Sequence, residues 1–242
     1  MTSYVRDKSG KKRLIKNKHC CTVSNIKYRN ERDVRMSTAK IEVRNYSNYQ
    51  EYIDHQKSKA DHGTPLYNLL LNELWEPDCE GFRENFRPYR EMLSGCRNAL
   101  CLGARTGQEV FVLRELGVED AIGIDLVATP PLVMEGDVHA LNFASASFDF
   151  VFSNIFDHVL FPDKFISEIK RVMKPNSFCL LHLSLASEGQ EHPDNDAWAA
   201  NTLRSSQVVV DLFGPDFEVV EDRLLQQAHW PTYWTLYVRK IA

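Results

Sequence analysis

Apolar and polar positions in the first part of this chain of 242 residues recur with a helical spacing. Apolar side chains three or four positions apart form one face of a helix, and residues 46–60 and 65–75 have this pattern. Thr64 followed by Pro65 is a good helix start, because a hydroxyl group caps the helix and proline suits its first position. A further helix or loop is expected over residues 82–93.

From residue 98 onward, short apolar runs alternate with amphipathic stretches. The runs predict buried strands, and the stretches predict helices. The expected strands are 99–102, 121–124, 148–152, 178–183, 217–220 and 233–238, and the expected helices are 108–116 and 162–173. Strands that alternate with helices indicate parallel β-α-β units, so the sequence predicts an α/β fold.

Polar residues stand where several of these strands end. Arg105 and Thr106 follow the first strand, Asp125 ends the second, and Ser153 and Asn154 end the strand that begins at 148. Ligands of parallel sheets bind beyond the carboxyl ends of the strands. We therefore expect these side chains to converge on one crevice.

A glycine turn between a strand and a helix is the best candidate for a binding site. It reads Leu102-Gly103-Ala104-Arg105-Thr106-Gly107, and glycines at such a turn let the backbone pass close to a ligand. The dinucleotide fingerprint G-x-G-x-x-G is not met, because Arg105 stands at the middle glycine, and no phosphate-loop Gly-Lys-Ser/Thr follows. The turn thus disfavours a nicotinamide or nucleoside-triphosphate enzyme and favours an adenosyl cofactor.

Two aspartates extend this site. Asp125 lies about 20 residues after the turn, where a carboxylate can bridge two ribose hydroxyls; the alternative is an aspartate that caps the next turn. Asp137 follows Gly136, and it can accept a hydrogen bond from an adenine amino group; the alternative there is a plain turn.

The stretch from Leu100 to Leu183 resembles the class I S-adenosylmethionine-dependent methyltransferases, especially the subgroup that acts on small molecules. The matching pieces are LGARTGQEV, GIDL, GDVHALNFASASFDFVFSN and PDKFISEIKRVMKPNSFCLLHL. The resemblance implies a Rossmann-like three-layer α/β/α sandwich with a seven-stranded, mostly parallel sheet. Its last strand, expected at 233–238, would insert antiparallel beside 178–183.

The resemblance also implies S-adenosyl-L-methionine as cofactor and assigns residues to it. Asp125 would bind the ribose and Asp137 the adenine, while the glycine turn would face the methionine portion and Asn154 would lie near the methyl group. The guanidinium of Arg105 is expected to pair with the cofactor carboxylate. The complete expected set is Gly103, Ala104, Arg105, Thr106, Gly107, Asp125, Leu126, Asp137, Val138 and Asn154.

Three places depart from the family pattern. One of them, Lys174-Pro175-Asn176-Ser177 where Lys/Arg-Pro-Gly-Gly is common, changes only a turn. Cys101 stands where the family usually has an acidic residue that helps to hold the cofactor ammonium, and Arg105 replaces a glycine. Because of these departures, a cofactor-binding partner protein without catalysis remains an alternative to an active methyltransferase.

A base is needed when the methyl acceptor carries a proton that must leave. His158 is the first candidate, because residues 154–160 leave a strand directly into the crevice, and Asp157 would orient it or cap a helix. The alternative role of His158 is to pack over the cofactor. Other histidines near the site are His182, expected as a satisfied core residue, and His192 and His229 on later loops.

The segment His229-Trp230-Pro231-Thr232-Tyr233-Trp234 is rich in aromatic side chains. It would either wall an acceptor pocket or cover the edge of the sheet. The Asn/Asp-Pro-Pro-Tyr motif of amino-methylating enzymes is absent, because Ser153-Asn154-Ile155-Phe156 has no proline. This absence favours a small-molecule acceptor with an O, N or S atom as the methyl-accepting group.

Charge is distributed unevenly along the chain. Residues 1–35 hold eleven Lys and Arg against three Asp and Glu, so this part carries +8 and the remainder −12 of the net charge of −4. We expect a basic, flexible tail over 1–36 and one domain over 37–242, with a helical cap at 37–97 and a Rossmann-like core at 98–242. A nuclear signal or a nucleic-acid contact is the alternative role of the tail.

An acidic body is a poor surface for phosphates, which weakens the case for a nucleic-acid substrate. A macromolecular methyltransferase that docks RNA or protein through the tail stays open as an alternative. The chain has no run of 18 apolar residues, no secretory h-region and no C-x-x-C pair. We therefore expect a cytoplasmic protein, with a nuclear location as the alternative, no membrane segment and no metal site. The sequence does not predict the oligomeric state.

Overall fold

The computed structural model describes residues 4–6, 12–14, 41–187, 196–225 and 233–241. The chain divides into two units, Met1–Thr38 and Ala39–Ala242. In the first unit, β1 (Tyr4–Arg6) pairs antiparallel with β2 (Lys12–Leu14). All other elements belong to the second unit. The expected tail boundary after residue 36 stays a prediction.

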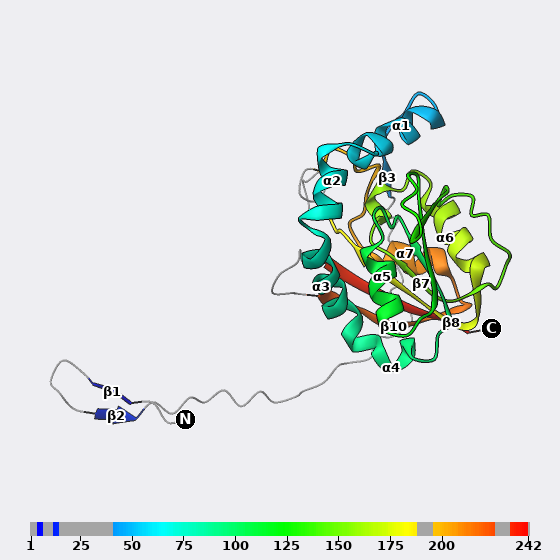
Figure 1. Cartoon of the computed structure of the whole chain (residues 1–242). Coiled ribbons are helices and arrows are strands. Elements are labelled where there is room, and N and C mark those ends of the chain that lie inside the picture. Colours follow the sequence, from blue (N-terminus) through cyan, green and yellow to red (C-terminus); the bar gives the residue numbers. More distant parts are fainter. Residues whose placement is uncertain (1–3, 7–11, 15–40, 188–195, 226–232, 242) are drawn as a thin grey trace. The chain divides into compact units, whose positions relative to one another are not determined.

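A seven-stranded sheet forms the centre of the second unit (Figure 1). Its order is β10-β11-β8-β7-β4-β5-β6. The strands are β4 (Asn98–Leu102), β5 (Asp120–Asp125), β6 (Val133–Glu135), β7 (Phe148–Ser153), β8 (Met173–Leu183), β10 (Phe217–Leu225) and β11 (Tyr233–Lys240). Only β11 in this sheet runs against its neighbours, β8 and β10. The predicted mostly parallel sheet with an antiparallel last strand is confirmed.

Helices cover both faces of the sheet. On one face, α3 (Trp75–Phe86) and α5 (Gln108–Glu115) pack against a core that includes Phe150 and Phe152. On the other face, α6 (Pro162–Val172) and α7 (Ser206–Phe213) pack against a second core. This arrangement confirms the predicted three-layer sandwich.

Side chains of β4 alternate between the two cores, as a strand buried on both faces requires. Leu100 and Leu102 point to the α6 side, whereas Ala99 and Cys101 point to the α5 side. Cys101 is fully buried with a free thiol, and so is Cys179 on β8. Both cysteines therefore lie in the core.

Helices before the sheet begin at capping residues. The helix α1 (Tyr49–Ala60) starts after Asn48, whose side chain accepts a hydrogen bond from the N–H of Glu51. The helix α2 (Pro65–Asn72) starts after Thr64 as predicted, and the Thr64 hydroxyl accepts from the N–H of Tyr67 at 3.2 Å. The expected start of α1 at residue 46 was three residues early, because Asn48 supplies the cap.

The segment after α2 differs from the prediction. The helix α3 begins at Trp75, which was expected at the end of the preceding helix, and a turn η1 (Arg87–Tyr89) and the short α4 (Arg90–Leu93) follow it. Pro77 lies in the first turn of α3, where backbone N–H groups have no acceptor within the helix. Proline, which has no N–H, therefore costs no helical hydrogen bond there. The prediction that a further helix or loop begins at residue 82 was therefore wrong, because α3 begins at Trp75.

Several short elements had no signal in the sequence. The strand β3 (Glu42–Val43) pairs antiparallel with β9 (Asn201–Thr202), and a turn of 3-10 helix, η2 (Phe156–His158), follows β7. Strands of two or three residues are too short to establish a period. None of the described helices has the length and apolar character needed to cross a membrane.

The stability of the sandwich should depend on the buried stripe of α6. Ile169 on this helix is fully buried. We predict that Ile169→Ala lowers the free energy of unfolding by about 2–5 kcal/mol, because it removes apolar contacts and leaves a cavity. Denaturant unfolding measures this change. Ser167→Ala, at an exposed position of the same helix, is the control and should change stability by less than about 0.5 kcal/mol. An equal effect of the two substitutions would contradict the packing described here.

Candidate functional site

Two hollows lie beyond the carboxyl ends of the strands and share a wall. Predicted residues that line the first hollow are Gly103, Arg105, Asp125, Leu126, Asp137, Val138 and His158. Predicted residues that line the second are Gly103, Ala104, Arg105, Thr106, Asn154, Asp157 and His158. Lys59, Gly103, Arg105, Ile155 and His158 line both hollows and so form the shared wall. Gly107 is the predicted site residue that lines neither of these two hollows.

The glycine turn has a conformation that restricts which residues can stand in it. Gly103 has a φ of 76°, and a Cβ atom there would lie 2.5 Å from Ile155. Gly107 has a φ of 94° and precedes the first residue of α5, where an added Cβ would lie 2.8 Å from the Cβ of Leu132. Arg105, in place of a glycine, also has a positive φ of 45°. The turn therefore keeps its left-handed backbone at Arg105 despite the side chain.

Asp125 joins the glycine turn to the end of β5. Its Oδ2 accepts a hydrogen bond from the backbone N–H of Arg105 at 2.9 Å, and its Oδ1 accepts from the N–H of Val127 at 3.2 Å. Burial raises the pKa of Asp125, while the charge of Arg105 and these N–H groups oppose the rise. The carboxylate is thus fixed in orientation at the wall of the first hollow.

Asp137 is held at another wall of the first hollow. Its Oδ2 accepts from the hydroxyl of Tyr49 at 2.5 Å, and its Oδ1 accepts from the backbone N–H of His139 at 2.8 Å. The N–H of Phe161 donates to Nε2 of His139, so Nδ1 carries the hydrogen that faces Asp137 at 2.8 Å. Although burial favours the neutral acid, the hydrogen bonds from His139 and Tyr49 lower the pKa of Asp137 to about 2. Asp137 is therefore a carboxylate at neutral pH.

Glu109 is a carboxyl group of the second hollow that the sequence reasoning missed. It lies in the first turn of α5, is 3% exposed and lines the hollow next to the glycine turn. Burial raises the pKa of Glu109 to about 8, and its charge also raises the pKa of the buried Cys101 thiol. In the described part of the chain, neither Glu109 nor Arg105 has a side-chain hydrogen bond or ion pair with another residue. Both groups are available to a ligand with opposite charges.

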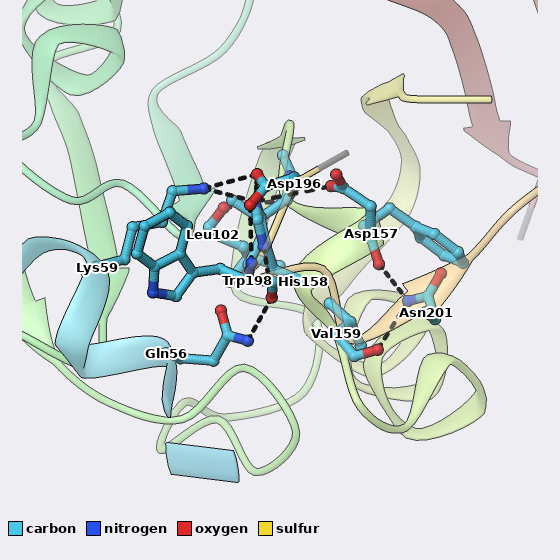
Figure 2. Close-up of polar contacts among 12 residues, drawn as sticks. Gln56, Lys59, Leu102, Asp157, His158, Val159, Asp196, Trp198 and Asn201 are labelled. Carbon is cyan, nitrogen blue, oxygen red and sulfur yellow. Dashed lines mark hydrogen bonds and ion pairs between the residues drawn. The ribbon is translucent and has the colours of Figure 1, made fainter. Parts of the chain in front are cut away.

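His158 lies on the turn η2 at the shared wall (Figure 2). The turn is fixed by the buried Asn201, whose amide donates to the carbonyls of Phe156 at 2.6 Å and Val159 at 2.7 Å. The hydroxyl of Tyr52 on α1 donates to the carbonyl of His158 at 3.0 Å. These bonds hold the backbone of η2, which carries His158, from two sides.

A cluster of charged side chains surrounds the imidazole (Figure 2). Nε2 of His158 lies 3.6 Å from a carboxylate oxygen of Asp196 and 4.0 Å from one of Asp157. The ammonium of Lys59 lies 3.0 Å from Asp196 and 3.1 Å from Nε2 of His158. Asp157, His158 and Asp196 offer atoms within 4.8 Å of one another, as metal ligands do, but the cation that contacts two of them is Lys59.

His182 does not join this cluster. It is buried as expected, but neither ring nitrogen has a hydrogen-bond partner among the described residues, so the prediction of a satisfied core histidine was wrong in this respect. Its ring stacks on Tyr233 at 5.4 Å, and burial lowers the pKa of His182 to about 4. His192 and His229 lie outside the described residues. Of the aromatic segment 229–234, the described Tyr233 lines the second hollow, whereas the indole N–H of Trp234 donates to Asp222.

Sequence reasoning also missed Lys59 and Asp196. Lys59 lies on α1, about forty positions before the glycine turn, and Asp196 lies on the loop before β9. No local pattern marks either residue, because their place in the crevice depends on how α1 and this loop fold back over the sheet. The spacing of Gln56 and Lys59, which puts both on one helix face, is the one signal that α1 offered.

Two solved structures with similar folds help to identify the domain. A Burkholderia thailandensis 1,6-didemethyltoxoflavin-N1-methyltransferase with bound 1,6-didemethyltoxoflavin and S-adenosylhomocysteine is 16% identical, with a TM-score of 0.60 over 84% of this chain and 95% of that chain. The PH0226 protein from Pyrococcus horikoshii OT3 is 15% identical, with a TM-score of 0.53 over 81% of this chain and all of that chain. At these identities the likeness shows the fold.

A family model gives the more specific result. No curated protein matches the chain in sequence. Residues 100–181, which run from β4 into β8, match the model of a methyltransferase domain. Together with the seven-stranded sheet and the crevice at its carboxyl end, this match shows that the chain contains a methyltransferase domain with the architecture of the class I S-adenosylmethionine-dependent enzymes.

Proposed function

We propose that the chain transfers a methyl group from S-adenosylmethionine to an O, N or S atom of a small-molecule acceptor, with His158 as the general base. The observation that carries the proposal is the position of His158 in the wall that two hollows share. The reacting methyl group of the cofactor and the acceptor atom would meet at this shared wall. A base in the wall therefore lies next to both. General bases must lie within hydrogen-bond reach of the proton that they remove.

The first hollow fits the adenosine part of the cofactor. The missing Cβ of Gly103 leaves room beside Ile155 for a close approach of a ligand to the backbone. The fixed carboxylates of Asp125 and Asp137 are acceptors for ribose hydroxyls and for an adenine amino group, respectively. When bound, the cofactor supplies an electrophilic methyl group on a sulfonium.

The amino-acid end of the cofactor would lie between two ionisable side chains of the second hollow, Arg105 and Glu109. Arg105 would pair with the carboxylate, and a guanidinium is suited to such pairing. Glu109 would receive the ammonium and so supply the negative charge that Cys101 lacks at the end of β4. Glu109 and Arg105 thereby remove the reason for regarding the chain as an inactive partner protein.

In the proposed mechanism, the chain's own residues orient the acceptor and remove one proton. Leu70, Phe82 and Tyr233 give the second hollow an apolar side, which excludes water from the reacting atoms. Nε2 of His158 takes the proton from the O–H, N–H or S–H bond of the acceptor. The carboxylates of Asp157 and Asp196 stabilise the resulting imidazolium until it gives its proton to solvent.

A small acceptor suits the shape of this site. The second hollow is bounded by side chains of α1, α2 and α3 as well as by the strand ends, so the acceptor lies inside the domain rather than on a flat surface. The similar Burkholderia thailandensis structure holds a small molecule, 1,6-didemethyltoxoflavin, with S-adenosylhomocysteine. The alternative is a macromolecular acceptor that docks through residues 1–36. If deletion of these residues abolishes methylation of RNA or protein, this alternative is correct.

Asp125 should contribute directly to cofactor affinity. We predict that Asp125→Ala weakens binding of S-adenosylmethionine by about 1–3 kcal/mol, because the ribose loses its charged acceptor. Isothermal titration calorimetry measures the change. Asp120→Ala, at the opposite end of the same strand, is the matched control and should leave the affinity unchanged. Unchanged affinity in the Asp125 variant would refute the ribose assignment.

Glu109 should link both stability and binding to pH. Its pKa of about 8 lies above the ordinary value, so the folded chain holds a proton that the unfolded chain releases. The free energy of unfolding of the cofactor-free protein should therefore fall as the pH rises from about 4.5 to 8, and Glu109→Gln should flatten this slope. Denaturant unfolding at several pH values tests this dependence.

An ammonium beside Glu109 lowers the pKa of the carboxyl, so cofactor binding at pH 7 should release a proton from it. Calorimetry in two buffers with different ionisation enthalpies measures this release. We expect Glu109→Gln to release fewer protons and to bind more weakly. Equal proton release by the two proteins would show that the ammonium lies elsewhere.

His158 should affect turnover far more than cofactor affinity. We predict that His158→Gln lowers methyl transfer by about 10²–10⁴-fold, the usual contribution of a positioned base. The assay follows labelled methyl from S-adenosylmethionine into the low-molecular-weight fraction of a metabolite extract. His62→Gln, on the exposed turn after α1, is the control and should keep the parent rate. A parent rate in the His158 variant would remove this residue from the mechanism.

A further inference from the structure

We propose that Lys59, on α1, is a positioning residue that fixes the tautomer of His158 and keeps the Nε2 lone pair directed at the wall between the two hollows. Its consequence for methyl transfer rests on the proposed function. The structural part of the inference, the tautomer, does not. Figure 2 shows the side chains of Lys59, His158 and Asp196 in one hydrogen-bonded group with the backbone of Trp198.

The partners of the imidazole determine where its hydrogen lies. Nδ1 of His158 lies 3.2 Å from the carbonyl oxygen of Trp198, which can only accept, so Nδ1 carries the hydrogen. Nε2 lies 3.1 Å from the ammonium of Lys59, which can only donate, so Nε2 presents its lone pair. The two contacts together select the neutral ring with the hydrogen on Nδ1.

Lys59 is held in place, unlike an ordinary surface lysine. Its side chain is 16% exposed, and its ammonium also donates to Asp196 at 3.0 Å. Asp196 is itself fixed, because its other oxygen accepts from the N–H of Trp198 at 2.8 Å. The ammonium has three donors, and its bonds to described residues, Asp196 and His158, use two of them. The third can serve a ligand in either hollow.

The helix α1 is anchored to the same loop by further bonds. The amide of Gln56 donates to the carbonyl of Trp198 at 2.7 Å, and the indole N–H of Trp198 donates to the hydroxyl of Ser58 at 3.1 Å. The carbonyl oxygen of Trp198 therefore accepts hydrogen bonds both from Nδ1–H of His158 and from the amide of Gln56. Gln56 lies one turn of α1 before Lys59. A single helix thus controls the surroundings of both ring nitrogens.

Charge around Lys59 is balanced so that the cation can stay buried. Burial and the nearby Arg105 lower the pKa of Lys59, while Asp196 and Asp157 oppose this. Asp196 therefore holds the ammonium of Lys59 beside Nε2 of His158.

During methyl transfer, the acceptor would replace Lys59 as the donor to Nε2, while Lys59 stays on Asp196. The bond from hydrogen to the acceptor atom would break as the Nε2–H bond forms, and the electron pair left on that atom would form its bond to the methyl carbon. The bond between the methyl carbon and the sulfonium would break in the same step, and its electron pair would leave with the sulfur. Lys59 would then lie beside the acceptor atom and stabilise its developing negative charge. The imidazolium would release its proton to solvent between Asp157 and Asp196.

The tautomer can be tested by NMR without any acceptor. We would label the full chain with ¹⁵N-histidine, assign His158 by its loss in His158→Gln, and read the tautomer from two-bond ¹H–¹⁵N correlations. We expect the Nδ1–H form in the parent protein and in Lys59→Arg, which keeps a cationic donor. Lys59→Met should shift the Nε2 resonance and populate the Nε2–H form several-fold more. An Nε2–H ring in the parent, or an unchanged spectrum in Lys59→Met, would overturn the inference.

A second readout is methyl transfer from labelled S-adenosylmethionine into the same metabolite extract. We expect Lys59→Met to lose about 10²-fold in rate and Lys59→Arg to recover most of it. Lys164→Met, on the exposed side of α6, is the matched control and should retain the parent rate and the parent histidine spectrum. Equal rates in Lys59→Met and the parent would contradict the positioning role.

The two proposals fail in different ways. If the parent protein transfers no methyl to any small molecule, the proposed function fails, but the histidine spectrum still decides the role of Lys59. If the parent transfers methyl and its ring is the Nε2–H form, the proposed function stands and the inference about Lys59 is wrong.

Discussion

The hydrogen bond from the backbone of Arg105 to the carboxylate of Asp125 is the contact on which the crevice depends. It ties the turn after β4 to the end of β5, and the N–H groups of Gly103 and Ala104 reinforce it by donating to the carbonyl of Ile124. The turn cannot adopt an ordinary right-handed path, because Gly103 and Gly107 have positive φ angles. Backbone conformation and one carboxylate thus together shape the wall of the first hollow.

The acceptor side of the crevice is built differently. Its parts come from η2, from the loop before β9 and from α1, and polar side chains rather than backbone geometry join them. Asn201 fixes the turn, and Lys59 and Trp198 fix the ring of His158 on that turn. Strand ends and the glycine turn therefore form the proposed cofactor side, while α1 and the loop before β9 orient the ring of His158. This division suits a fold in which the donor is constant and the acceptor varies from one enzyme to another.

The parts of the fold and site that could be predicted from the sequence are those with a local cause. The helix start at Thr64 and Pro65 follows from capping chemistry, and the glycine turn and Asp125 follow from a strand, a turn and a spacing of about 20 residues. The start of α3 at Trp75 was missed, because apolar side chains continue through the break at Glu73 and Leu74. The apolar spacing of α2 therefore continues into α3, and the boundary between the two helices could not be predicted from it.

Other parts of the site have causes that lie far apart in the chain. Glu109 reads as an ordinary first-turn acid of a helix, and only its burial under the second hollow raises its pKa to about 8. Lys59 reads as a solvated helix residue until α1 folds over the crevice and brings it 3.1 Å from His158. His182 shows the converse: a histidine in an apolar strand is buried there without hydrogen-bond partners among the described residues. The environment of each of these residues depends on its position in the folded chain, which the periodicity of the sequence does not reveal.

A crystal structure of the chain with S-adenosylhomocysteine would show which hollow receives which part of the cofactor. We expect ribose hydroxyls on Asp125, adenine beside Asp137 and Val138, the amino group at Glu109, and the sulfur at the wall formed by Gly103, Ile155 and His158. Adenosine bound elsewhere, or a first hollow filled by the side chain of Arg105, would contradict this expectation.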